Sequence, residues 1–278
     1  MNSSESDFDL VIEPKKNIGH YWRDLWKFRG LFYFLAWRDL LVRYKQTAIG
    51  IAWSVIRPLI TLVVFTVIFG NIAKLPDQGV PYALLVCAAM IPWQFFANSF
   101  TEISNSLLAN SNLLSKIYFP RLIIPISSVI VSLVDAAITL VILFGLMIYY
   151  HFMVRWQLIL MPLFLLLALI NSFGAGILIA GLNVKFRDFK YIIPFIVQIG
   201  LYVSPVGFSS SIVPEKYRLL YALNPMVGII DGFRWCILGG EAGFYWPGFA
   251  LSIGLSLFLL FVGLRYFRKM EKSFADVI

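Results

Sequence analysis

Charged residues are scarce in this chain. Only 14% of its 278 residues are Asp, Glu, Lys or Arg, whereas 60% are hydrophobic and the mean hydropathy is +0.81. Soluble domains are about half apolar and about a quarter charged, so water cannot be the only solvent of this fold. The composition therefore predicts an integral membrane protein whose remaining apolar surface is covered by lipid.

Several catalytic motifs are also absent. No run fits G-x-x-x-x-G-K-[S/T], so the chain does not bind ATP through a P-loop. Neither a G-x-S-x-G run nor a close acidic pair inside an apolar segment suggests hydrolysis or glycosyl transfer. The two histidines, His20 and His151, are predicted on opposite sides of the membrane, and Cys87 and Cys236 indicate no disulfide framework. We expect no catalysis, metal or cofactor in this chain alone.

Six apolar segments are long enough to cross a bilayer, which takes about 20 residues. They are Ile49–Ile72, Val80–Ile103, Phe119–Tyr150, Trp156–Leu182, Tyr191–Val213 and Trp246–Phe267. The sequence therefore predicts an all-α membrane fold with six transmembrane helices.

The basic residues predict the orientation of these spans. Seventeen Lys and Arg residues lie before the first span, in alternate loops and in the C-terminal tail, and five lie in the opposite loops. Because Lys and Arg are retained inside, both termini are expected in the cytoplasm. The net charge of +8 then marks topology and predicts no nucleic-acid partner. The polar first eighteen residues, with Glu5, Asp7 and Asp9, indicate no cleavable signal peptide.

The segment from His20 to Lys45 has the pattern of helices that lie along the membrane surface. Trp22, Leu25 and Trp26 share one helical face, and charged residues lie opposite. This segment is either a surface anchor or a collar against which a cytoplasmic partner pushes. The predicted organisation is a polar N-terminus (1–19), interfacial helices (20–48), a transmembrane domain (49–270) and a cytoplasmic tail (271–278).

Two charged residues fall inside apolar spans. Asp135 lies near the middle of the third span, and an intramembrane acid almost always faces protein or water. We favour a structural hydrogen bond to a neighbouring helix over proton coupling. Arg57 lies about two turns inside the first span, where it either snorkels to the interface or faces a passage and meets an anionic substrate group.

The second half of the chain contains breaks and small residues. Pro194 and Ser204-Pro205 interrupt the fifth span, and the semi-apolar stretch Pro214–Tyr245 that follows is interpreted as short re-entrant helices or, alternatively, as an ordinary external loop. In the fourth span a helix-packing face is predicted from the small residues Gly174, Gly176, Ala180 and Gly181.

Five runs follow one another in a characteristic order. They are R-D-L-L-V-R-Y-K-Q-T with W-S-V-I-R-P-L after it, I-P-W-Q-F-F-A-N, S-N-L-L-S-K-I-Y-F-P-R-L-I-I-P, L-N-V-K-F-R-D-F-K-Y and L-N-P-M-V-G-I-I-D-G-F-R-W. In these runs and in its tail, the chain resembles the permease subunit of a type-2 ABC exporter, in the branch that moves lipopolysaccharide O-antigen and capsular polysaccharides. The resemblance extends from about Ile12 to the C-terminus. One departure is Arg57, where related chains often have Gln.

The resemblance implies two copies of the chain forming a twelve-helix channel, with two separate P-loop ATPase subunits that bind ATP and Mg. It also implies a turn between the second and third spans, at about Ser104–Ile117, that couples the channel to the ATPase, here called the coupling turn. The alternative is a polar turn that only connects the two spans. The residues expected to contact the ATPase are Asn110, Asn112, Leu113, Leu114, Ser115, Ile117, Arg187 and Asp188.

Aromatic residues make up 17% of the chain. Most belong to membrane-interface belts, but some are expected to line a passage and stack on sugars. The candidates for the passage are Arg57, Tyr82, Trp93, Phe96, Phe100 and Tyr118. The favoured function is export of a lipid-linked polysaccharide from the cytoplasm across a bacterial inner membrane. Export of capsule, teichoic acid or small molecules, and a non-transporting membrane enzyme or scaffold, remain alternatives.

Overall fold

A computed structural model describes residues 18–45, 50–76, 79–114, 116–153, 155–186, 188–239 and 244–271. This part of the chain is helical and contains no β-strand, as predicted. The predicted N-terminus and C-terminal tail lie almost entirely outside it. The elements are α1 (Ile18–Lys27), α2 (Arg29–Lys45), α3 (Ala52–Phe65), η1 (Thr66–Ile72), α4 (Tyr82–Ala109), α5 (Ser111–Leu114), α6 (Ile123–Tyr149), η2 (Trp156–Leu160), α7 (Met161–Lys185), α8 (Phe189–Val203), η3 (Ser210–Ile212), α9 (Glu215–Tyr221), α10 (Pro225–Leu238) and α11 (Trp246–Glu271).

Five helices in the described ranges are long and apolar enough to cross a membrane. They are α3 with η1, α4, α6, η2 with α7, and α11. The predicted fifth span contains α8, which has 15 residues, and the short η3 after it. At a rise of ~1.5 Å per residue, α8 covers less than the ~30 Å hydrocarbon core. The predicted count of six spans is therefore not confirmed. The helix ends because Ser204 adopts the extended backbone favoured before a proline, here Pro205.

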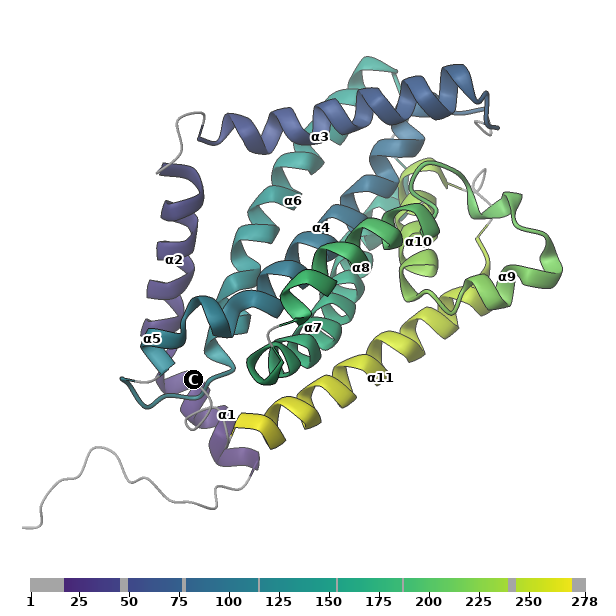
Figure 1. The fold of residues 1–278 in the computed structure, drawn as a ribbon. Coiled ribbons are helices and arrows are strands. Elements are labelled where there is room, and N and C mark those ends of the chain that lie inside the picture. The colour runs from purple at the N-terminus through teal and green to yellow at the C-terminus, as the bar shows by residue number, and fades with distance from the viewer. Residues whose placement is uncertain are drawn as a thin grey trace, which may run out of the picture.

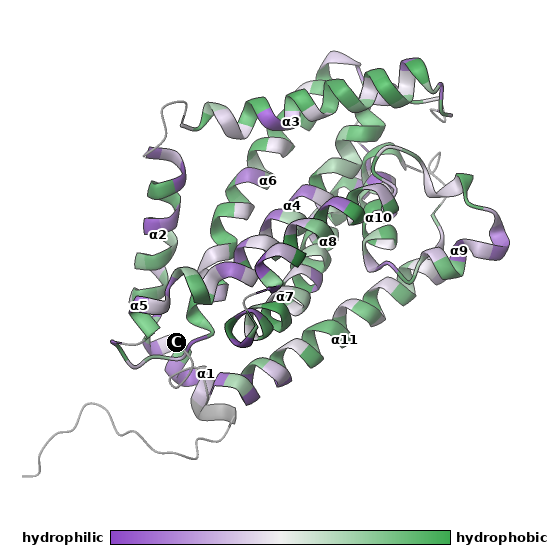
Figure 2. Ribbon diagram, viewed as in Figure 1, coloured by the Kyte–Doolittle hydropathy of each residue, from purple (hydrophilic) through white to green (hydrophobic). Residues whose placement is uncertain are grey.

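Helix α4 is the centre of the bundle. It packs against α6, α7 and α10, and most of its residues are buried (Figure 1). By contrast, α3 runs along one side of the molecule and α11 along another, and few residues of either apolar span are buried. Hydrophobic residues cover most of α3, whereas α9 and α2 carry more hydrophilic ones (Figure 2). The bundle thus has a buried central helix and lipid-compatible outer helices.

The small residues of α7 form the packing face that the sequence predicts. A Cβ on Gly174 would overlap the backbone of Leu260 in α11, and one on Gly176 would lie 2.7 Å from Ile103 in α4. Backbones approach this closely only where side chains are absent. These glycines allow α7 to contact α4 and α11 at the same time.

The N-terminal segment forms two helices, with a break at Phe28. Leu25 packs against the core, whereas Trp26, predicted on the same helical face, is largely exposed, so the position of α1 along the membrane surface stays a prediction. The Tyr21 hydroxyl donates a hydrogen bond of 3.1 Å to the Glu271 carboxylate at the end of α11. The first and last described helices are thereby joined, and α2 then runs along α6.

Short helices follow α8, as predicted for Pro214–Tyr245. The Asn224 side chain accepts from the Met226 amide and caps α10, and Pro225 occupies its first turn. From α10 the buried Arg234 donates to the carbonyls of Leu85, Val206 and Phe208 over 2.7–3.2 Å. These bonds attach the short helices to α4, while their depth in the bilayer stays a prediction.

Candidate functional site

The first turns of α3 place a cation beside an aromatic ring. Arg57 is the sixth residue of this helix and is exposed, and its guanidinium carbon lies 5.9 Å from the ring centroid of Trp53. A cation over an indole face at this distance is attracted by the ring quadrupole. Trp53 and Arg57 are four residues apart, so the helix itself aligns them.

Helix α4 contributes a polar stripe opposite these residues. Gln94, Asn98 and Glu102 recur every four residues and are only partly buried, whereas Trp93, Phe96 and Phe100 face the core. Residues at i, i+4 and i+8 share one helical face. An otherwise apolar helix therefore presents two amides and a carboxylate on a single side.

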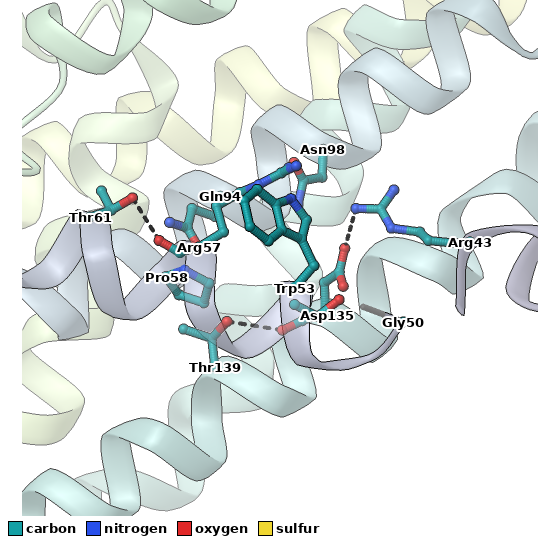
Figure 3. Close-up of a pocket in the computed structure, with 11 residues that line it drawn as sticks. Arg43, Gly50, Trp53, Arg57, Pro58, Thr61, Gln94, Asn98, Asp135 and Thr139 are labelled. Atoms are coloured by element: carbon teal, nitrogen blue, oxygen red, sulfur yellow. Dashed lines mark hydrogen bonds and ion pairs between the residues drawn. The ribbon is translucent and has the colours of Figure 1, made fainter. Parts of the chain in front are cut away.

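A cavity of about 610 Å³ lies between α3, α4 and α6 (Figure 3). This volume is within the range of ~300–1,000 Å³ typical of small-molecule sites. Its polar lining comprises Arg43, Ser54, Arg57, Thr61, Gln94, Asn98, Asp135 and Thr139. Figure 3 shows Gln94, Trp53 and Arg57 together on one side and Arg43 pointing to Asp135 on the other.

Asp135 is bound by the neighbouring helix α2. One carboxylate oxygen lies 2.6 Å from Nη2 of Arg43, and the other accepts from the Tyr44 hydroxyl at 2.8 Å. Arg43 also contacts Glu102 at 3.1 Å. One arginine of α2 thus bridges carboxylates of α4 and α6, which compensates two acids that would otherwise be costly to bury. These contacts match the structural bond expected for Asp135.

Tyr44 acts as a hydrogen-bond donor here. Burial, with the hydrogen bond to Asp135 as a second cause, raises the pKa of Tyr44 to about 12. The phenol is therefore protonated at any physiological pH. Asp135 receives both a neutral hydrogen bond and a charged one from α2.

The predicted passage residues do not meet in one place. Arg57 alone among them lines the cavity. Trp93, Phe96 and Phe100 form a continuous series of ring contacts with centroids 5.6 and 5.8 Å apart, and all three are buried in the core. The Tyr82 hydroxyl donates to the carbonyl of Gly207, and Tyr118 is exposed in the segment after α5. A substrate role for these five aromatics stays a prediction.

The predicted coupling turn divides into inward and outward residues. Leu114 is buried and Leu113 packs against the core, whereas Ile117 and Asn112 are exposed. The Asn110 side chain accepts from Arg38 of α2 at 2.8 Å. Leu114 packs within its own chain and leaves almost no exposed surface for a partner. Asp188 is exposed beside the start of α8, and Ser115 and Arg187 lie outside the described residues.

Two parts of this site were not predicted from the sequence, the Arg43–Asp135 ion pair and the Gln94–Asn98 face. Arg43 and Asp135 are 92 positions apart, and no local pattern indicates that they pair. Gln94 and Asn98 had a signal, because their four-residue spacing with Glu102 marks a polar face on an apolar helix. No group of three potential metal ligands occurs in the part of the chain that the structure describes.

A polar, charged cavity between apolar helices is compatible with a membrane permease. The sequence of residues 30–238 matches the family model described as ABC-2 type transporter, and the chain belongs to this family. The family resemblance inferred from the motifs is thereby confirmed.

Three relatives illustrate the similarity. The chain is 27% identical over 273 residues to the O-antigen export system permease protein RfbA of Klebsiella pneumoniae, covering 97% of this chain and 100% of that protein. It is 26% identical over 258 residues to RfbA of Myxococcus xanthus, covering 92% and 98%. The inner membrane transport permease YadH of Escherichia coli K12 is 23% identical over 199 residues, covering 67% and 76%.

Proposed function

We propose that this chain is the channel-forming subunit of an ATP-driven exporter that moves a lipid-linked polysaccharide from the cytoplasm across the bacterial inner membrane. The observation that carries the proposal is the cavity in which Arg57 lies with Gln94 and Asn98. A guanidinium binds a phosphate through two parallel hydrogen bonds, and amides bind sugar hydroxyls. The O-antigen permeases among the relatives support the same substrate class.

The orientation follows from the basic residues. Arg43 reaches the cavity from α2, which belongs to the segment rich in Lys and Arg that the positive-inside rule assigns to the cytoplasm. The cavity then lies toward the cytoplasmic entrance, where an anionic lipid-linked substrate begins its passage. Both termini lie in the cytoplasm in this arrangement.

Two partners complete the transporter. A second copy of the chain covers α3 and α8, whose apolar side chains are exposed around much of each helix, including Ile60, Val63, Phe195 and Tyr202. Two P-loop ATPase subunits bind ATP and Mg and supply the energy, since this chain has no P-loop of its own. The exposed part of the coupling turn, around Ile117, is their contact surface.

Co-purification with the ATPase tests this function. The chain, purified alone, should hydrolyse no ATP; co-expressed with an ABC ATPase subunit from the same organism, it should purify as a complex with ATPase activity. Undecaprenyl-diphosphate-linked glycan should stimulate that activity, and undecaprenyl phosphate without glycan serves as the control. ATPase activity in a verified single-chain preparation would contradict the proposal, as would a complex whose ATPase activity does not rise when the glycan lipid is added.

A further inference from the structure

A second pocket lies far from the Arg57 cavity, at the end of the molecule formed by α9 and α10 (Figure 1). Its volume is about 240 Å³, below the ~300–1,000 Å³ typical of drug-sized ligands. Segments from both sides of α10 converge here: η3 and α9 precede it, and Phe244 and Tyr245 lead into α11. The pocket is therefore built by one region of the chain, from Ser210 to Gly248, and suits one small ligand.

The polar groups of this pocket can form hydrogen bonds with hydroxyl groups of a ligand. The carboxylate of Asp231 projects from α10, and the buried Tyr221 hydroxyl has no hydrogen-bond partner among the described residues. The hydroxyl oxygen is covered by protein atoms, so it meets a ligand in the pocket only if the Tyr221 ring turns outward, and the gain of a hydrogen-bond partner favours that turn. Arg218 is held across the pocket by bonds of 3.0 and 3.2 Å to the carbonyls of Val213 and Ser211.

Asp231 remains an acceptor at neutral pH. Burial raises the pKa of Asp231 to about 6, while a hydrogen bond from Ser210 and the positive charge of Arg234 act in the opposite direction. The carboxyl group is therefore mainly ionised at pH 7. Its charge is opposed across the pocket by that of Arg218, which disfavours a simple anion and a simple cation alike.

Aromatic rings form the apolar wall. Phe244 is fixed among Trp246, Phe249 and Trp235, with ring centroids 4.6, 5.2 and 5.6 Å away. Tyr221 and Tyr245 add two further rings to the lining. Apolar walls with a few placed polar groups are typical of specific small-ligand sites. Such a wall can pack against the C–H face of a sugar ring while hydroxyl groups meet Asp231 and Tyr221.

We infer that this pocket binds a single neutral sugar ring of the exported glycan on the side where the polymer leaves the membrane. The inference rests on the proposed function, because it takes its ligand from the polysaccharide. It adds a second, separate contact: the Arg57 cavity meets the charged lipid end at the entrance, and the Asp231 pocket meets sugar at the exit. A zwitterionic headgroup would also satisfy both charges but leaves the aromatic wall without a partner.

Saturation-transfer NMR on the full complex in nanodiscs tests the pocket. The probes are methyl glycosides of glucose, galactose, mannose, rhamnose and N-acetylglucosamine, with phosphoethanolamine as the zwitterionic comparison. At least one glycoside should receive saturation, most strongly at its ring C–H protons. Tyr221→Phe and Asp231→Asn should weaken binding about threefold to tenfold, the effect of losing one hydrogen bond.

Tyr217→Phe is the matched control, because Tyr217 lies on the same helix α9 but is 52% exposed and is not part of the pocket lining. Tyr221→Phe should leave thermal stability unchanged, since the hydroxyl it removes has no partner. No transfer from any glycoside, equal transfer in the Tyr221→Phe and Tyr217→Phe proteins, or transfer from phosphoethanolamine alone would overturn the inference. Glycoside binding without glycan-stimulated ATPase activity would instead contradict the proposed function and leave the pocket as a sugar site.

Discussion

Arg57 lies inside an apolar helix and lines a cavity, and export by its variants distinguishes substrate binding from snorkelling. If its guanidinium binds the diphosphate of the substrate, Arg57→Met should lower export about tenfold or more, because hydrogen bonds to charged groups contribute about 1.5–3 kcal/mol. Arg57→Lys should be intermediate, since Lys keeps the charge without the bidentate geometry. Arg57→Gln should be mild. Export is measured per membrane-inserted protein.

The snorkelling interpretation gives the opposite order. Lys would then be fully active, and Met would lower the amount of inserted protein rather than its specific activity. Full export from a normally inserted Arg57→Met protein would remove this residue from the substrate path.

Asp135 is expected to act through stability. Asp135→Asn removes the 2.6 Å ion pair with Arg43 but keeps an acceptor for Tyr44. Because the pair is largely buried, we expect a loss of about 1.5–3 kcal/mol in the free energy of unfolding in detergent, with export per folded protein retained. Asp39→Asn is the control, since the more exposed Arg38–Asp39 pair should contribute less. A stable Asp135→Asn protein without export would point to proton coupling instead.

At the scale of elements, the contact between α7 and α11 depends on a missing side chain. Gly174→Ala places a methyl group against the backbone of Leu260, and overpacking of this kind costs typically about 1–3 kcal/mol. Gly254→Ala in α11 is the control, because a Cβ there meets no atom within 4 Å. Thermal unfolding should therefore distinguish the two variants. Equal melting temperatures would show that the two helices do not need this close approach.

The coupling turn is best tested on its outward face. Ile117→Asp should uncouple ATPase activity from export while leaving insertion intact, because a charge would be desolvated in the contact with the ATPase. Leu219→Asp is the control: Leu219 and Ile117 are both 53% exposed, but Leu219 lies in α9 on the opposite end of the bundle. Leu114→Asp should instead reduce folding, since Leu114 is buried in its own chain. Normal coupling in the Ile117→Asp protein would place the docking surface elsewhere.

The sequence predicted elements better than it predicted contacts. Apolar length is a local property, so the five long spans, counting η1 with α3 and η2 with α7, begin close to their predicted starts, while α4 continues to Ala109, beyond its predicted end at Ile103. The exception is α8: the Ser204-Pro205 break was identified from the sequence, but the segment was still counted as a span, because its hydropathy stays high beyond the break. The partners of Asp135 depend on how α2 lies against α6, which no periodicity encodes. The aromatics of α4 were expected in a passage, yet the opposite, amide-bearing face lines the cavity.

At the scale of the whole molecule, a well-packed centre is flanked by helices with uncovered apolar surface. Helix α4 is held by α6, α7 and α10, whereas α3 touches the bundle sparsely and carries Arg57 and one wall of the cavity. Helices with few buried contacts are the ones that move at low cost in free energy. A displacement of α3 would change the width of the cavity without disturbing the core around α4.

The most direct test is translocation by the purified transporter. Proteoliposomes containing this chain and its ATPase are supplied with undecaprenyl-diphosphate-linked glycan and ATP, and glycan on the opposite leaflet is detected with a reagent that cannot cross the membrane. We expect ATP-dependent translocation only when both proteins are present, lowered about tenfold or more by Arg57→Met and largely kept with Arg57→Gln. Translocation without the ATPase, or none with the complete complex, would contradict the central claim that this chain forms an ATP-driven path for a lipid-linked polysaccharide.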